Sequence, residues 1–148
     1  MTTHTYASTL QWSGRTDDYD GYSRRHDITL SGTAVAVSAD PAFRGDGALP
    51  NPEQLLVAAA SSCQLLSFLA VAALAGVQVL EYRDEAEGVM PDDRRPLRLT
   101  RIVLRPRIVV QGATVERVER LLHKAHQQCY IANSLTTDVA LEPVIEVR

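Results

Sequence analysis

Cysteine and clustered positive charge are both scarce in this sequence. Cys63 and Cys129 are the only two cysteines among 148 residues, and they are far apart along the chain. Two isolated cysteines fit neither a secreted disulfide framework nor a CxxC zinc or redox motif. No block of basic residues is present and the formal net charge is −3, so nucleic-acid binding has no electrostatic basis.

Secretory, repetitive and low-complexity features are also missing. The first residues, Met1 to Thr5, lack the charged-then-apolar pattern of a signal peptide, so we predict a cytoplasmic location. Hydrophobic residues make up 45% of the chain and charged residues 22%, which is ordinary for a soluble globular protein. We therefore expect a single domain spanning residues 1–148.

One long apolar stretch, residues 51–75, has the features of a helix. Asn51 is a favourable N-cap, Pro52 suits the first helical position, and Glu53 lies near the positive end of the helix dipole. Gly76 is a good C-terminal cap. A helix that is apolar on all sides is either buried or spans a membrane.

Burial is the better interpretation of this helix, and we predict no membrane association. Serines and a glutamine interrupt the apolar stretch, and no cluster of Lys or Arg flanks it. One sheet covers only one side of such a helix, and the second predicted helix is too short and amphipathic to cover the rest. A homodimer that packs two of these helices together would complete the burial.

The remaining elements are predicted from hydrophobic periodicity. An amphipathic helix with Thr114 as its N-cap is expected over residues 115–128. Strands are expected at residues 5–12, 22–30, 32–38, 77–90, 97–110, with a break near Pro106, and 139–147. The order β-β-β-α-β-β-α-β is an α+β layout, in which the fourth and fifth strands form a hairpin.

Cys63 lies in the middle of the long helix, where a thiol without a partner behaves as an inert hydrophobic group. A reactive Cys63 would need a positive charge to stabilise its thiolate. Arginine is the best candidate because it stays charged when buried. The segment before the helix contains four arginines, Arg15, Arg24, Arg25 and Arg44.

Glu53 precedes Cys63 by ten residues on the same predicted helix. That separation corresponds to about 15 Å of rise and roughly 80° of rotation, so the two side chains cannot touch along one straight helix. Either the helix breaks between them, or Glu53 serves a site that includes a partner chain. Its position also suits the ordinary role of a helix-dipole partner.

Cys129 lies at the C-terminal end of the second helix, where the negative dipole end should raise the pKa of a thiol. Cys129 is therefore better suited to resolving a reaction than to starting one. His123 and His126 nearby could suggest a metal site with Cys63. Two histidines near a helix end are more often surface residues, and we predict neither a metal nor an organic cofactor.

The segment Asn51-Pro52-Glu53-Gln54-Leu55-Leu56 is followed by small residues and by Cys63 ten positions after the glutamate. A second cysteine occurs late in an amphipathic helix. Together these features resemble the OsmC/Ohr family of osmotically inducible and organic-hydroperoxide-resistance proteins. The resemblance extends from the first strand to Val147, and the order of elements agrees with it.

This resemblance implies an OsmC-like fold, an intertwined homodimer and a thiol peroxidase with its active sites at the subunit interface. Cys63 would attack an organic hydroperoxide and become a sulfenic acid. Cys129 would resolve it as an intramolecular disulfide, and a dithiol reductant would restore both thiols. Glu53 would orient an arginine against the sulfur.

The resemblance does not identify the arginine by motif. Arg24 is our first choice, with Arg44 and Arg15 as alternatives. Two neighbours of the cysteines also depart from the family pattern, since Gln64 replaces a frequent aromatic and Tyr130 a usual proline. These departures leave two other functions open: a non-catalytic dimer that binds a small apolar ligand at its interface, and a purely structural dimer module.

Overall fold

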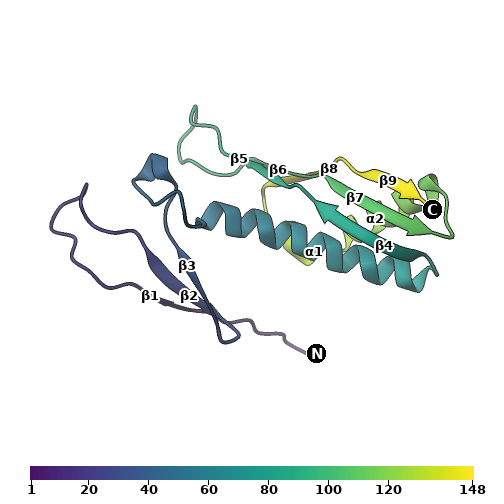
Figure 1. Cartoon of the computed structure of the whole chain (residues 1–148), viewed down its shortest axis with the longest axis horizontal. Helices are drawn as coiled ribbons and strands as arrows, with labels where there is room; N and C mark the ends of the chain where they lie inside the picture. The colour runs from purple at the N-terminus through teal and green to yellow at the C-terminus, as the bar shows by residue number, and fades with distance from the viewer. The chain divides into compact units, whose positions relative to one another are not determined.

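A computed structural model describes residues 1–148, and the chain's internal contacts divide it into two compact units, Met1–Leu55 and Leu56–Arg148. Three strands come first, a long helix follows, and six more strands with two further helices complete the chain (Figure 1). This arrangement confirms the predicted α+β class. That residues 1–148 form a single domain remains a prediction.

The first unit is built on an antiparallel three-stranded meander of β1 Thr9–Gln11, β2 His26–Leu30 and β3 Thr33–Val37. Ser31 and Gly32 join β2 to β3 with φ angles of 48° and 80°, as expected for a two-residue hairpin turn. A single 3₁₀ turn, η1 Pro41–Phe43, lies in the loop that follows.

The first two strands are shorter than predicted, and the second begins late because the chain between them forms a folded loop. The prediction began these strands at residues 5 and 22, whereas they begin at residues 9 and 26. The indole Nε1 of Trp12 donates to the carbonyl of Ser23 at 2.8 Å. Ser23, which was predicted to lie in the second strand, is therefore part of the loop. The Trp12 and Tyr22 rings meet edge to face, with centroids 6.4 Å apart.

Helix α1, Pro52–Leu74, begins and ends where the sequence predicts. The Gln54 amide donates to Asn51 Oδ1 at 2.9 Å, and the Asn51 amide donates to Gln54 Oε1 at 3.0 Å. This reciprocal pair is a capping box, with glutamine in the place of glutamate. Gly76 follows the helix with φ of 71°, which confirms the predicted C-terminal cap.

The second unit contains two three-stranded sheets. In one, β7 Pro106–Gln111 lies between β4 Gln78–Asp84 and β9 Val144–Val147, antiparallel to the first and parallel to the second (Figure 1). In the other, β6 Arg101–Leu104 lies between β5 Glu87–Val89 and β8 Asp138–Leu141 in the same manner. The predicted hairpin of the fourth and fifth strands is therefore present as two successive pairings.

Each of the last three predicted strands is split in two, which produces the second sheet. Pro106 and Pro143 lie at two of the three interruptions, and proline cannot donate a ladder hydrogen bond. At Arg105, between β6 and β7, the backbone amide donates instead to Asp84 Oδ1 at 2.7 Å. Ser61 of α1 donates to the other oxygen of the same carboxylate. Asp84 thus connects α1 to the point where the two sheets separate.

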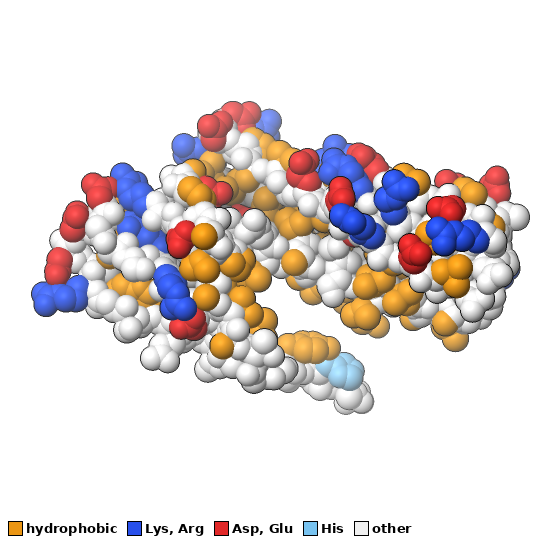
Figure 2. Space-filling view, in the orientation of Figure 1, with side chains coloured by type: hydrophobic (Ala, Val, Ile, Leu, Met, Phe, Trp, Pro, Cys, Tyr) orange, Lys and Arg blue, Asp and Glu red, His pale blue; other side chains and the backbone are white.

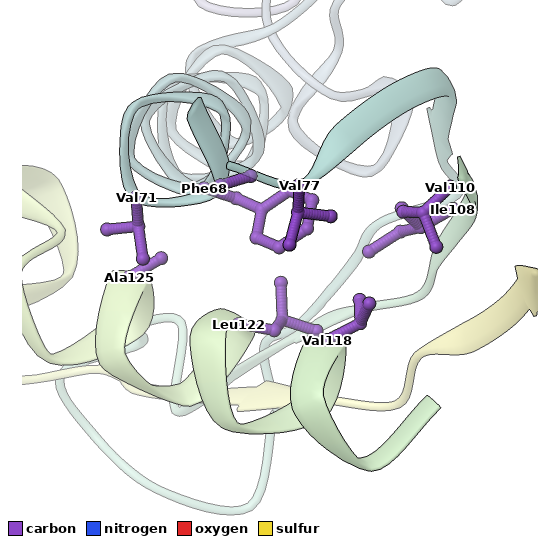
Figure 3. Close-up of a cluster of buried hydrophobic side chains, with 9 residues drawn as sticks. Phe68, Val71, Val77, Ile108, Val110, Val118, Leu122 and Ala125 are labelled. Atoms are coloured by element: carbon purple, nitrogen blue, oxygen red, sulfur yellow. The ribbon is translucent and has the colours of Figure 1, made fainter. Parts of the chain in front are cut away.

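The main core lies between α1, the β4-β7-β9 sheet and α2 Val115–Gln127. Phe68 and Val71 of α1 point toward the α2 side chains in Figure 3, and Phe68 is fully buried. Thr114 caps α2 as predicted, since its hydroxyl accepts from the Arg117 amide at 3.3 Å. The buried members of this core are Phe68, Val71, Ala72, Val77, Ile108, Val110, Val118, Leu122 and Ala125.

Within one chain, α1 buries one face only. Its buried residues are Ala60, Gln64, Phe68, Val71 and Ala72. Leu66 and Leu74 are 64% and 91% exposed. Figure 2 shows hydrophobic side chains along α1, whereas charged side chains gather over the strands of the second unit. By length and composition α1 could cross a membrane, but core helices of soluble proteins pass the same test, so this is weak evidence.

Candidate functional site

The second unit brings the two cysteines together. Cys63 lies in the middle of α1 and is partly exposed, whereas Cys129 follows α2 and is 1% exposed. Both are free thiols. The Cys63 side chain lies close enough to Cys129 to raise the pKa of the Cys129 thiol. Two elements distant in the sequence therefore present adjacent sulfur atoms.

The environment of Cys129 favours its protonated form. Burial raises the pKa of the Cys129 thiol, and the neighbouring Cys63 thiol raises it further. The backbone amides of Ala132 and Ile131 act in the opposite direction without cancelling the increase. At neutral pH the Cys129 thiol is thus a poor nucleophile for attack on an external molecule.

Cys129 lies between α2 and a second, much shorter helical segment. Its amide donates to the His126 carbonyl at 3.1 Å, and its carbonyl accepts from the Asn133 amide at 3.0 Å. The second bond begins α3 Tyr130–Asn133, a single turn that the sequence did not predict. Cys129 has an extended backbone between α2 and α3, and its side chain is buried, whereas that of Tyr130 is 80% exposed.

Polar side chains link α1 to α2 next to the cysteines. Gln64, which directly follows Cys63, is fully buried, and its Oε1 lies 3.3 Å from His126 Nδ1. Its Nε2 donates to the Leu122 carbonyl at 3.5 Å. One turn further along α1, the Ser67 hydroxyl donates to the Ala125 carbonyl at 2.7 Å.

Tyr82 of β4 contributes a buried hydroxyl to the same core. Its ring lies 6.0 Å from that of Phe68, and its hydroxyl has no hydrogen-bond partner. Burial raises the pKa of the Tyr82 phenol, and the charges of Asp84 and Cys129 add to this increase. Tyr82 is therefore a neutral, unpaired donor.

The first-choice arginine, Arg24, belongs to the first unit and is surrounded by aromatic rings and carbonyl groups. Its guanidinium donates to the carbonyls of Tyr22, at 2.5 Å, and Tyr19. It also stacks over the Tyr22 ring, with Cζ 3.6 Å from the ring centroid. Arg24 is a member of none of the ion pairs, unlike Arg44 and Arg15.

The alternative arginines are already paired with carboxylates. Arg44 contacts Asp20 at 2.6 Å, and Arg15 contacts Asp17 at 2.8 Å, both on the exposed surface. Glu53, partly buried in the first turn of α1, forms no ion pair. Because α1 is continuous from Pro52 to Leu74, the helix break that the sequence left open is excluded.

The histidines do not assemble a metal site. No group of three or more His, Cys, Asp or Glu side chains lies close enough together to hold a metal ion. His126 instead faces Gln64, and His123 is exposed. The contact between Gln64 and His126 was missed by sequence analysis, which treated each residue separately. The signal was present, because Gln64 falls four residues after Ala60 and four before Phe68, on the buried stripe of the helix.

Comparison with known proteins agrees with this architecture. A family model described as OsmC-like protein matches residues 45–143. An OsmC-like protein of unknown function from Vibrio cholerae O1 biovar eltor str. N16961 is 31% identical, with a TM-score of 0.87, over 96% of this chain and 100% of that one. The protein YmaD of Bacillus subtilis (strain 168) is 23% identical, covering 100% of this chain and 97% of its own.

A more distant structure carries a functional description. An organic hydroperoxide resistance protein from Elizabethkingia anophelis, with thiocyanate bound, is 18% identical over 99% of both chains, with a TM-score of 0.70. At this identity the likeness shows the shared fold alone.

Proposed function

The chain belongs to the OsmC-like protein family, which includes organic hydroperoxide resistance proteins, and from this premise we propose that it is a thiol-dependent peroxidase for organic hydroperoxides. The observation that carries the proposal is the pairing of a partly exposed Cys63 with a buried Cys129. Such a pair suits an attacking thiol and a resolving thiol.

In the first step the Cys63 thiolate attacks the distal oxygen of the hydroperoxide. An S–O bond forms, the O–O bond breaks, and the departing alkoxide takes up a proton to leave as an alcohol. Cys63 becomes a sulfenic acid. The Cys129 thiolate then attacks the oxidised sulfur, so that an S–S bond forms and the S–O bond breaks, and the departing hydroxide takes up a proton to leave as water. A dithiol reductant finally exchanges with this disulfide and returns both thiols.

The difference in exposure assigns the two roles. A hydroperoxide can reach the partly exposed Cys63, whereas Cys129 is buried and its raised pKa keeps it protonated. After oxidation, Cys129 needs to reach only the adjacent sulfur, and proximity compensates for its low thiolate fraction. We therefore assign attack to Cys63 and resolution to Cys129.

We assign activation of Cys63 to Arg24. Glu53 would orient the Arg24 side chain, and the site would be shared between two subunits. Arg24 is the one candidate among the three whose charge has no carboxylate partner, since Arg44 and Arg15 are paired. A positive charge beside a thiolate lowers the thiol pKa and increases the reactive fraction. Because α1 does not break, Glu53 is proposed to act on the Cys63 of a second chain.

The proposed assembly is a homodimer in the reducing cytoplasm, where a dithiol reductant is available. The exposed apolar face of α1, which includes Leu66 and Leu69, supports it. Leu66→Glu should convert the dimer to monomer, because a charge would have to be buried at the interface. Sedimentation equilibrium measures this, and a dimer that persists unchanged would contradict the assignment of this face.

The central test is oxidation of the purified, reduced protein by an alkyl hydroperoxide. We expect consumption of about one equivalent of peroxide and loss of two hydrogen atoms in the intact mass, with the disulfide mapped to Cys63 and Cys129 by peptide analysis. Cys63→Ser should abolish consumption while circular dichroism stays unchanged. If both thiols of the wild type remain free in excess peroxide, the proposed activity is wrong.

A further inference from the structure

Gln64 places a fully buried amide directly after Cys63. A leucine at this position could pack in the core without hydrogen-bonding requirements, whereas a buried amide costs free energy unless it is paired. Both ends of the Gln64 amide have partners, and both partners belong to α2. The residue therefore fixes α2 relative to the turn of α1 that carries Cys63.

The hydrogen-bond pattern sets the direction of the link to His126. Gln64 Nε2 donates to the Leu122 carbonyl, which turns Oε1 toward the imidazole ring. An amide oxygen can only accept, so His126 Nδ1 must carry the hydrogen in this contact. The hydrogen bonds from α1 to α2 therefore have fixed donors and acceptors.

The backbone of His126 connects these hydrogen bonds to Cys129. Its carbonyl accepts the Cys129 amide at 3.1 Å, and it lies nearly one helical turn before Cys129. Gln64 is covalently attached to Cys63. Covalent bonds and hydrogen bonds therefore link Cys63 to Cys129 by way of Gln64 and His126, and the two thiols also lie close together.

Disulfide closure depends on such an arrangement, because only a narrow range of backbone separations and side-chain directions allows an S–S bond. On the basis of the proposed peroxidase function, we propose that Gln64 and His126 are a positioning pair that holds Cys129 for closure onto oxidised Cys63. The pair touches neither the peroxide nor the reacting sulfur atoms, and it acts on the second step alone.

The test compares the two steps in single turnover. Gln64→Met keeps the length of the side chain and removes both hydrogen bonds, and His126→Phe keeps a ring and removes the donor. With one equivalent of alkyl hydroperoxide, peroxide consumption reports the first step, and mass analysis of quenched samples reports closure. A 1,3-diketone that traps sulfenic acids reports the intermediate.

We expect both variants to consume the first equivalent of peroxide at the wild-type rate, within about twofold. Closure should slow by about tenfold, the factor for loss of a typical buried hydrogen bond, and the trapped sulfenic acid should increase accordingly. His126→Asn retains an N–H donor close to the Nδ1 position and should restore closure to near the wild-type rate.

Arg117→Met is the matched control. The Arg117 guanidinium donates to the Ala75 carbonyl at 2.6 Å, so it also links α2 to the region of α1, but at the end of α2 away from Cys129. Its loss should lower the stability of the fold and leave the rate of closure unchanged. A slow closure in Arg117→Met would indicate a general effect of helix packing and would overturn the assignment to Gln64 and His126.

A second oxidant separates this inference from the proposed function. Diamide, an azo compound, accepts a thiolate at its N=N bond, and a second thiol displaces the resulting hydrazine to form a disulfide. If the wild type ignores hydroperoxide but closes rapidly with diamide, the peroxidase proposal fails and the positioning pair is still tested. If Gln64→Met and His126→Phe close as fast as wild type with both oxidants, or lose both steps equally, the positioning role is wrong.

Discussion

The two units of the chain are stabilised in different ways. Of the buried hydrophobic residues, only Val37 lies in the first unit, and all others, from Ala60 to Cys129, lie in the second. The first unit relies on strand pairing, on hydrogen bonds such as that of Trp12, and on arginine stacked against tyrosine rings. The second unit has a continuous core between helices and sheets.

The parts of the candidate site therefore differ in how they are supported. Cys63 and Cys129 lie on elements that pack in the core, and hydrogen bonds link α1 to α2 beside them. Arg24 is attached to a loop in a unit with almost no core of its own. A catalytic charge on such a segment requires further contacts to fix it, which is what the proposed partner subunit would supply.

The largest expected effect comes from breaking the core of the second unit. Phe68→Ala removes a fully buried ring and should lower the free energy of unfolding by about 3–5 kcal/mol, measured by urea denaturation of the reduced protein. The control in the first unit is Leu10→Ala, because Leu10 is 63% exposed and should cost less than about 0.5 kcal/mol. Equal losses at both sites would contradict the difference between the units.

The second prediction concerns Arg24 of the first unit. Arg24→Met should slow oxidation of Cys63 by roughly 10- to 100-fold, because loss of a nearby positive charge raises a thiol pKa by about one to two units. Stopped-flow measurement of peroxide consumption reports this. Arg15→Met removes an exposed charge that is already paired with Asp17 and should have little effect. If Arg44→Met is the slow variant instead, the assignment moves to Arg44.

A third prediction follows from the raised pKa of Cys129. Above the unfolded-state thiol pKa of about 8.5, the unfolded chain loses a proton that the folded chain keeps. Stability contributed by this group is therefore complete below that pH and decreases as pH rises, by less than about 1.4 kcal/mol per unit. Denaturant titrations of the reduced protein at pH 8 to 10 measure it. Cys129→Ala should flatten the curve, and an unchanged slope would show that another group causes the pH dependence.

The smallest effect is expected at Tyr82. Its hydroxyl is buried and has no hydrogen-bond partner, so Tyr82→Phe removes a desolvation cost while keeping the ring against Phe68. We expect the free energy of unfolding to increase by about 1 kcal/mol, seen as a higher midpoint of thermal or urea unfolding. A clear decrease would show that the hydroxyl makes a favourable contact in solution.

Much of the fold could be predicted from local sequence signals. The limits of α1 follow from Asn51, Pro52 and Gly76, whose preferences act within a few residues, and Thr114 determines the start of α2 in the same way. Strand interruptions were less predictable, because the exit at Arg105 depends on a carboxylate of β4 that is distant in sequence. The turn α3 has no strong local signal at all.

Part of the candidate site could likewise be predicted from the sequence, and part depends on tertiary packing. Cys63 and Cys129 could be proposed from the sequence because of their types and of the family resemblance, and the structure places them side by side. The contact between Gln64 and His126 could not, since it depends on how two helices pack. The arginine could not be selected from the sequence either, because Arg24 differs from Arg44 and Arg15 in having no ion-pair partner, which depends on how the loop folds.

The two parallel strand pairings have a consequence for how the molecule is made. β8 pairs with β6 and β9 with β7, so residues 138–147 complete both sheets of the second unit. Contacts this far apart in sequence form slowly and late in folding. A chain leaving the ribosome therefore holds both cysteines on an unfinished scaffold until its last strands emerge. During this interval the fold does not yet protect its thiols.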